Sequence, residues 1–206
     1  MKTLIAIPCM DQVEARFRAC LASLEKPGEV TVATQIGSLV YDSRNSLAKT
    51  ALNANADYVL WLDSDMMFQS DVLKRLLKHA ENGLDIVSGL YFRRAAPFTP
   101  VLFKELMRDG KPVEAKGFED YPMDSLFEVD GCGFGCVLMN TDVLVEMALE
   151  FNQWFNPTNG FGEDLSFCIR AKALGYKIWC DSSIKLGHVG HLIVDENVYL
   201  SANQKG

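Results

Sequence analysis

Apolar and polar positions alternate along the first 92 residues in the manner of an α/β protein. Apolar runs at 3–9, 30–36, 58–62 and 85–92 predict four strands, and the mixed segments between them predict three helices. Strands that alternate with helices in this way favour a parallel sheet. The first half of the chain therefore predicts a layered domain with helices packed on a sheet.

Short polar signals mark the ends of these helices. The first helix is expected over 12–25, while Ser43 and Ser70 are expected to be the N-caps of the second and third helices. Asn82 and Gly83 are expected to end the third helix, because glycine readily takes the left-handed conformation that closes a helix.

The second half is less regular. Residues 93–126 contain Pro97, Pro100, Pro112 and Pro122, which indicate a loop-rich insertion. Beyond it we expect a strand at 137–139, a helix capped by Thr141 and ending near 150, a helix over 163–174 closed by Gly175, and a strand at 184–186.

Composition narrows the class of protein. The 206 residues suit one domain, and a net charge of −7 disfavours a long nucleic-acid interface, which needs a basic surface. The first apolar run is too short for a leader, and no stretch approaches the ~20 apolar residues that span a bilayer. We therefore expect a cytoplasmic protein without integral membrane contact.

The six cysteines favour reduced thiols. Most lie within apolar strand or helix patterns, which is typical of buried free cysteine. Cys132 and Cys136 lack the second paired half of a zinc motif, so a zinc site is disfavoured.

The strongest candidate chemistry follows the strand at 58–62. Asp63-Ser64-Asp65 is placed at the carboxyl end of this strand, where open α/β sheets bind their ligands. Two carboxylates one residue apart can face the same point, and their oxygens suit Mg²⁺ or Mn²⁺ bridging a diphosphate. The alternative is an ordinary strand-to-helix turn, in which Asp and Ser are common caps.

Further motifs follow in a fixed order, and together they resemble a known family. They are Ser43-Arg44-Asn45, Asp63-Ser64-Asp65-Met66, Gly89-Leu90-Tyr91-Phe92-Arg93-Arg94, Gly131-Cys132-Gly133-Phe134-Gly135, Gly162-Glu163-Asp164 and Gly187-His188-Val189-Gly190-His191. Over roughly residues 1–191 the set resembles glycosyltransferases with the GT-A fold, and is closest to small family-2-like enzymes of bacteria and their phages.

This resemblance implies an architecture. It predicts a single GT-A, Rossmann-like domain, with a central mainly parallel sheet flanked by helices and a smaller sheet region on the acceptor side. Residues 1–92 would form the nucleotide-sugar-binding half, 93–191 the acceptor-side half with the insertion at 93–126, and 192–206 a C-terminal tail.

On the donor side, the resemblance implies that Pro8, Cys9 and Asp11 hold the nucleotide base. Ser64 is grouped with its two aspartates as a donor-binding residue. Arg44 matches a basic residue near the diphosphate or the sugar, and a guanidinium can grip paired phosphate oxygens. A salt bridge along the helix is the alternative role for Arg44.

For the metal, the resemblance implies Mn²⁺ or Mg²⁺ held by Asp63, Asp65 and His188. A neutral imidazole is a good third ligand for Mn²⁺, although a lone histidine can equally be structural. His191 is the second choice for this role and is otherwise expected to bind the sugar or the acceptor.

The acidic pair Glu163 and Asp164 opens a predicted helix. Acidic residues favour this position for stability alone, because the helix dipole is positive there. The family pattern implies in addition that one of them takes a proton from the acceptor hydroxyl. Asp164 is the first choice for this base, while Glu163 would bind an acceptor hydroxyl or exchange roles with it.

Several residues are expected around the sugar and the acceptor. Bare backbone at Gly131 and Gly133 would allow close approach of a sugar, and the preceding Asp130 would bind sugar hydroxyls. Trp154, with its neighbour Phe155, is expected either to form a platform for a sugar face or to be a buried aromatic pair. Arg93 is grouped with these residues.

These observations predict a metal-dependent glycosyltransferase that uses a nucleoside-diphosphate sugar, with a UDP-sugar favoured and with inversion at the anomeric carbon. A retaining enzyme, a non-catalytic sugar- or nucleotide-binding module and a nucleotidyltransferase are the alternatives. The nucleotidyltransferase is disfavoured because residues 10–13 contain no Gly- and Arg-rich phosphate loop. The acceptor is left open among glycan, protein, lipid and modified nucleic acid.

Overall fold

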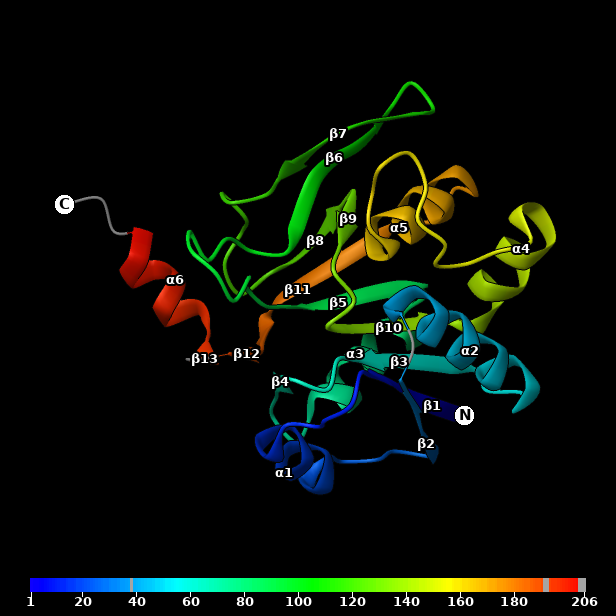
Figure 1. Cartoon of the computed structure of the whole chain (residues 1–206), viewed down its shortest axis with the longest axis horizontal. Coiled ribbons are helices and arrows are strands. Elements are labelled where there is room, and N and C mark those ends of the chain that lie inside the picture. Colours follow the sequence, from blue (N-terminus) through cyan, green and yellow to red (C-terminus); the bar gives the residue numbers. More distant parts are fainter. Residues whose placement is uncertain (38, 191–192, 204–206) are drawn as a thin grey trace.

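The computed structural model describes residues 1–37, 39–190 and 193–203, and within them a seven-stranded sheet forms the centre of the molecule (Figure 1). The strand order is β2-β1-β3-β10-β5-β11-β8. The strands are β1 (Lys2–Cys9), β2 (Glu29–Ile36), β3 (Tyr58–Leu62), β5 (Ile86–Leu90), β8 (Leu126–Val129), β10 (Cys136–Asn140) and β11 (Ile178–Lys185). β10 and β8 run against the other strands. The predicted α/β domain with a mainly parallel central sheet is confirmed.

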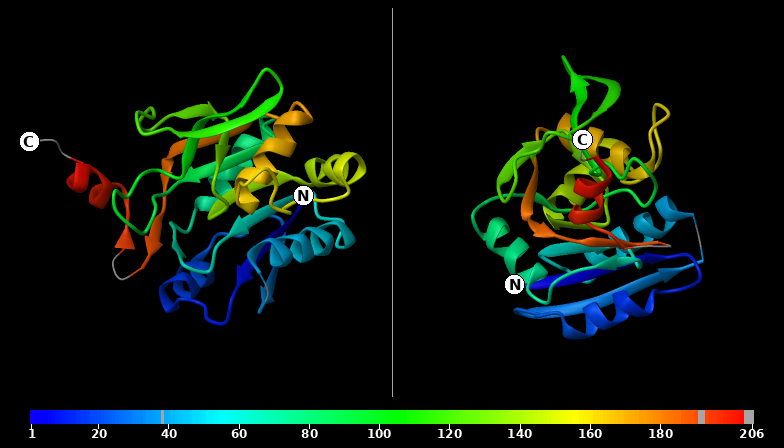
Figure 2. Two further views of the ribbon diagram at one scale, coloured as in Figure 1. Left: turned by 45° about the horizontal axis from the view of Figure 1, so that its top comes forward. Right: turned by 90° about the vertical axis from the view of Figure 1, so that its left-hand side faces the viewer.

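Helices cover both faces of this sheet (Figure 2). They are α1 (Ala15–Ser23), α2 (Val40–Asn53), α3 (Val72–Glu81), α4 (Thr141–Phe151), α5 (Glu163–Ala173) and α6 (Glu196–Asn203). α2, α4 and α5 pack in the core on one face, and α1 and α3 pack in the core on the other. None of the described helices is long and apolar enough to cross a membrane.

The central strand β3 supplies both cores. Val59 and Trp61 point into the core beneath α2, α4 and α5, while Leu60 and Leu62 point into the core beneath α1 and α3. This division follows from the two-residue period of a strand. A strand with both faces buried needs a continuous apolar run, and residues 58–62 provide one. Asp63 follows directly, at the end of this central strand.

The direction of β10 is a feature that the sequence patterns did not predict. β10 lies between β3 and β5 and is antiparallel to both, with Val137 opposite Trp61 on one side and Ser88 on the other. The apolar run at 137–139 predicts this strand but not its direction, because a short run that is buried on both faces gives no information about strand orientation.

Regular strands occupy part of the segment 93–126, where a loop-rich insertion was expected. β6 (Leu102–Arg108) and β7 (Lys111–Gly117) form a hairpin that pairs with β9 (Gly131–Cys132). Asp109 and Gly110 both have positive φ, 51° and 74°, as a two-residue hairpin turn requires. Pro112 is tolerated because β7 is at the edge of this small sheet.

Several element ends differ from the predictions. α1 begins at Ala15, α2 begins at Val40 with Ser43 inside its first turn, and Asp71 rather than Ser70 is the N-cap of α3. Asn140, not Thr141, caps α4, and its side chain accepts a hydrogen bond from the Asp142 amide at 2.9 Å. β11 includes the expected 184–186 strand only in part, since it runs from Ile178 to Lys185.

Replacing Gly131 tests the packing around β9. Gly131→Ala should lower the free energy of unfolding by about 1–3 kcal/mol, because its Cβ would lie 2.3 Å from Leu106 Cδ1 and 3.3 Å from Cys168 Cβ. Urea denaturation measures this difference. Gly117→Ala on β7 is the matched control, because its Cβ would meet nothing nearer than Glu119 Oε1 at 4.0 Å. Equal losses in the two variants would contradict the packing argument.

Candidate active site

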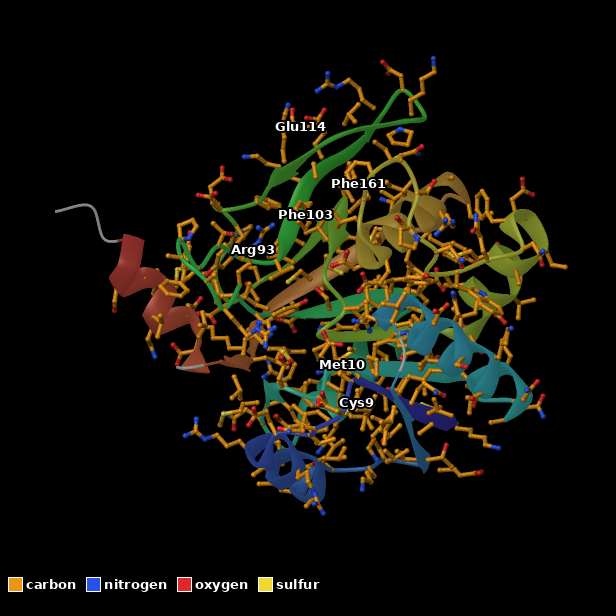
Figure 3. The ribbon with its side chains drawn as sticks, in the orientation of Figure 1. Cys9, Met10, Arg93, Phe103, Glu114 and Phe161 are labelled. Atoms are coloured by element: carbon orange, nitrogen blue, oxygen red, sulfur yellow. The ribbon has the colours of Figure 1, made fainter. Side chains whose placement is uncertain are left out.

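A cavity of about 300 Å³ opens at the carboxyl ends of β1 and β3. Figure 3 labels Cys9 and Met10 where β1 ends, and Arg93 in the loop that follows β5. The predicted residues that line the cavity are Pro8, Cys9, Arg44, Asp63, Ser64, Asp65, Glu163 and His188. One concave site therefore brings together most of the donor-side and metal-site predictions.

His188 reaches this site through a small sheet. β12 (Gly187–Val189) pairs with β4 (Met66–Met67) and with β13 (Ile193–Val194), and His188 lies opposite Met66. The Val189 amide also donates to the main-chain oxygen of Asp65 at 2.8 Å. Main-chain pairing therefore holds His188 beside the turn that follows β3.

The buried guanidinium of Arg44 connects the two acidic parts of the cavity. Its Nη2 donates to Asp63 Oδ1 at 2.8 Å, and its Nε lies 3.5 Å from Glu163 Oε1. Burial alone would lower the pKa of Arg44, but the carboxylates of Asp63, Glu163 and Asp164 raise it above its ordinary value. Its partners lie outside its own helix, so the predicted salt bridge along the helix is not what the structure contains.

The two aspartates of the Asp63-Ser64-Asp65 turn have different environments. Burial raises the pKa of Asp63 above its ordinary value despite the opposing effect of Arg44. Burial also acts to raise the pKa of Asp65, but His188 and Arg94 outweigh it and lower that pKa. Asp65 Oδ2 lies 2.8 Å from Arg94 Nη1 and 3.4 Å from His188 Nε2.

The tautomer of His188 follows from its second contact. Its Nδ1 lies 2.9 Å from the main-chain oxygen of Phe92, which can only accept a hydrogen bond. Nδ1 therefore carries a proton, and Nε2, which lies on the side of Asp65, is the ring nitrogen that a metal ion could bind. Metal-binding histidines are commonly oriented in this way by a backbone carbonyl.

This donor set is chemically suited to Mn²⁺ or Mg²⁺, because it combines carboxylate oxygens with an imidazole nitrogen on the same side of the cavity. In the described part of the chain, however, no group of three or more His, Cys, Asp or Glu side chains is arranged to hold a metal ion. Asp63 and Asp65 are each paired with a guanidinium instead. The residue types fit the ion, and binding it would require the exposed ion pair between Asp65 and Arg94 to rearrange.

Glu163 and Asp164 begin α5 next to the cavity. Glu163 lines the cavity, whereas Asp164 is not among its lining residues and accepts a hydrogen bond from the Leu165 amide at 2.7 Å. Burial, followed by the negative charge of Glu163, raises the pKa of Asp164 to about 6. A carboxyl group with this pKa can exchange a proton near neutral pH.

The predicted sugar platform at Trp154 is not supported. Trp154 and Phe155 are buried, and Trp154 Nε1 donates to the main-chain oxygen of Leu144 at 2.7 Å. Phe155 stacks on Phe167 with ring centroids 4.6 Å apart. The buried aromatic pair, which was the alternative interpretation, describes these residues.

The residues from Asp130 to Gly133 also have roles in packing. Asp130 accepts from the amide nitrogens of Leu106 and Met107 and pairs with Lys172 Nζ at 2.5 Å. A Cβ on Gly133 would lie 2.1 Å from the Tyr91 hydroxyl oxygen. The space above Gly131 and Gly133 is filled by side chains of the protein itself, Leu106 and Tyr91, and not left open for a sugar as expected.

Three further predictions are not placed at the cavity. Asp11 and Arg93 are exposed and do not line it. His191 lies outside the described residues.

Four lining residues were missed by the sequence analysis: Met10, Val40, Ser43 and Arg94. Ser43 was read as a helix cap. The sequence does contain a signal for Arg94, because it belongs to the Arg93-Arg94 pair that follows a strand on the same edge of the sheet.

Comparison with protein families decides the classification. Residues 42–146, slightly more than half of the chain, match the family described as glycosyl transferase family 2. The chain belongs to glycosyl transferase family 2. The match to this family includes Arg44, Asp63, Asp65 and Arg94 but ends before the acidic pair at the start of α5.

Solved structures agree with the fold of a family-2 glycosyltransferase. A197 from STIV superimposes with a TM-score of 0.66 at 21% identity, over 92% of this chain and 86% of that one. S. aureus TarS 1-349 gives a TM-score of 0.52 at 16% identity, over 89% of this chain and 61% of that one. No curated protein matches the sequence. At these identities the likeness shows the fold alone.

Replacing Asp130 distinguishes its structural role from sugar binding. Asp130→Ala should lower the free energy of unfolding by about 2–3 kcal/mol, because it leaves two amide donors and Lys172 without their acceptor. Glu128→Ala on neighbouring β8 removes only the exposed pair with Lys177 and should change stability by less than about 0.5 kcal/mol. Urea denaturation measures both variants. Unchanged stability of Asp130→Ala together with weaker donor binding would favour a role in the sugar site.

Proposed function

We propose that this family-2 glycosyltransferase moves a sugar from a nucleoside-diphosphate sugar, favoured to be a UDP-sugar, to a nucleophile on an acceptor molecule. The observation that carries this proposal is the cavity at the ends of β1 and β3. There the aspartates that follow β3 face the acidic start of α5 across the buried Arg44. The donor diphosphate would bind beside the aspartates and the acceptor beside the acidic start of α5, so the sugar would be transferred between these two groups.

The charge of the cavity supports a requirement for a divalent cation. Its lining contains the carboxylates of Asp63, Asp65 and Glu163 against the guanidinium groups of Arg44 and Arg94. The carboxylates outnumber the guanidinium groups, and this excess of negative charge would repel an anionic diphosphate. Mn²⁺ or Mg²⁺ held by the two aspartates and His188 would reverse that balance and neutralise the charge that develops on the leaving diphosphate.

The donor nucleotide would lie along the end of β1. Pro8 and Cys9 provide backbone and apolar surface there, and the exposed Met10 and Val40 extend this surface. A flat nucleobase can cover such side chains and remove their apolar area from water. Arg44 lies deeper in the cavity. It would act on the phosphate side of the donor by holding Asp63, one of the proposed ligands of the metal ion.

Asp164 is proposed as the general base of a single displacement with inversion. Its carboxylate would take the proton of the acceptor hydroxyl while the acceptor oxygen bonds to the anomeric carbon and the bond from that carbon to the diphosphate breaks. Glu163 would fix the orientation of Arg44 and hold an acceptor hydroxyl. The raised pKa of Asp164 gives it more affinity for the proton than an ordinary carboxylate has.

Thermal melting tests the donor and metal together. UDP, GDP, CDP, ADP and dTDP are each added with Mn²⁺ and with a chelator. One of them should stabilise the protein only with Mn²⁺, since a ligand at 100 times its dissociation constant adds about 2.7 kcal/mol, or roughly 5–10 °C here. Asp65→Ala should lose this shift while remaining folded, and Asp142→Asn, at the opposite edge of the sheet, should keep it. If none of the five nucleotides stabilises the protein, the proposed use of a nucleoside-diphosphate sugar is wrong.

Replacing Asp164 tests the base. Asp164→Asn should retain nucleotide binding and lower kcat by on the order of 10²-fold or more, because an amide cannot accept the proton. The measurement is release of nucleoside diphosphate from the donor in the presence of an acceptor found by screening. Near-normal turnover in Asp164→Asn, with loss in Glu163→Gln, would assign the base to Glu163.

The pH dependence of turnover should reflect the ionisation of Asp164. Asp164 acts only when ionised, and its pKa is about 6. The value of kcat/KM should therefore be level above this pH and fall about tenfold per unit below it. Asp164→Asn should lack this acidic limb. An acidic limb of the same shape in the variant would point to a different titrating group.

A further inference from the structure

Arg94 occupies the carboxylate that the proposed metal needs. Its Nη1 donates to Asp65 Oδ2 at 2.8 Å, the same oxygen that lies 3.4 Å from His188 Nε2. The contact joins the loop after β5 to the turn after β3. A guanidinium and a divalent cation cannot both take the same short contact with this oxygen, because their positive charges repel.

Arg94 and Arg44 differ in their freedom to move. The Arg94 side chain is 54% exposed and extends from a loop whose residues 93–97 are all exposed. The Arg44 side chain is 3% exposed and lies between two carboxylates and the rings of Phe134 and Phe155. Arg94 can therefore leave Asp65 without disturbing the core, whereas Arg44 cannot leave its position.

We propose that Arg94 neutralises Asp65 in the free protein and moves its guanidinium to the donor diphosphate when the metal ion takes that carboxylate. This inference rests on the proposed function and adds a second residue that binds phosphate. A guanidinium matches two phosphate oxygens as well as it matches a carboxylate, so the ion pair with Asp65 is exchanged for an equivalent one.

Metal ion and donor would then bind cooperatively. The ion alone must displace Arg94, which gains no new partner, and this lowers affinity for the ion in the absence of nucleotide. A diphosphate gives Arg94 its new partner and leaves Asp65 open to the ion. Each ligand therefore strengthens the binding of the other by the same factor, as linkage requires.

The test measures the two ligands separately in wild type and Arg94→Ala. Titration with Mn²⁺ alone, followed by the electron paramagnetic resonance signal of the free ion, should show about 2- to 5-fold tighter binding in Arg94→Ala, because an exposed competing ion pair is removed. With Mn²⁺ saturating, calorimetry with the same five nucleoside diphosphates should show binding on the order of 10-fold weaker in the variant. Their parent nucleosides, which lack phosphate, should bind the two proteins equally.

Two control variants accompany this test. Arg108→Ala removes another exposed arginine that is paired with a carboxylate, Glu105, on the hairpin of β6 and β7 outside the cavity. It should change neither affinity. Arg94→Lys keeps the charge without the paired donors, and it should recover part of the nucleotide affinity.

The inference requires that Arg94→Ala binds Mn²⁺ more tightly and nucleoside diphosphates more weakly than the wild type. Arg94→Ala that weakens both Mn²⁺ and nucleotide binding would show that the arginine merely supports the shape of the site, and unchanged affinities would show that it takes no part. Either result overturns this inference and leaves the proposed function standing. Failure of the wild type to bind Mn²⁺ or any of the nucleotides would overturn the proposed function and the inference with it.

Discussion

The site depends on one buried positive charge, the guanidinium of Arg44 between Asp63 and Glu163. A buried charge is tolerated only when it is paired, and loss of one partner of such a pair costs about 3–5 kcal/mol. The end of β3 and the beginning of α5 must therefore remain close together whenever the protein is folded. This requirement gives the cavity a fixed width between the proposed diphosphate site and the proposed base.

The aromatic core beneath Arg44 makes this arrangement rigid. Trp61 of β3 contacts Phe155 at 4.9 Å between ring centroids, and Phe155 stacks on Phe167 of α5. The rings thus connect the same strand and helix that the ion pairs connect, and the face of Phe134 lies 5.5 Å from the guanidinium carbon. Phe155, which was considered together with Trp154 as a platform for a sugar, instead belongs to the packing beneath the site.

Sequence patterns predicted much of the fold and most of the residues that line the cavity, for physical reasons. Apolar runs such as 58–62 have to be buried strands, and polar residues placed directly after parallel strands have to meet at one edge of the sheet. The position of β10 between β3 and β5, by contrast, depends on pairing between distant segments, which a local pattern does not record. Asp130 and Gly131 were expected to lie at the sugar for a related reason, because Leu106, against which both are packed, is far away in the sequence.

The pairing of β12 with β4 also determines when the site can form. His188 and Asp65 face each other only after a segment near residue 188 adds its main chain to the strand that follows the Asp63-Ser64-Asp65 turn. During synthesis the aspartates, Arg44 and the acidic pair of α5 all leave the ribosome before His188 does. A nascent chain would therefore expose the proposed aspartate ligands before it exposes the third proposed ligand, His188, so the proposed metal site would form only after β12 has paired with β4.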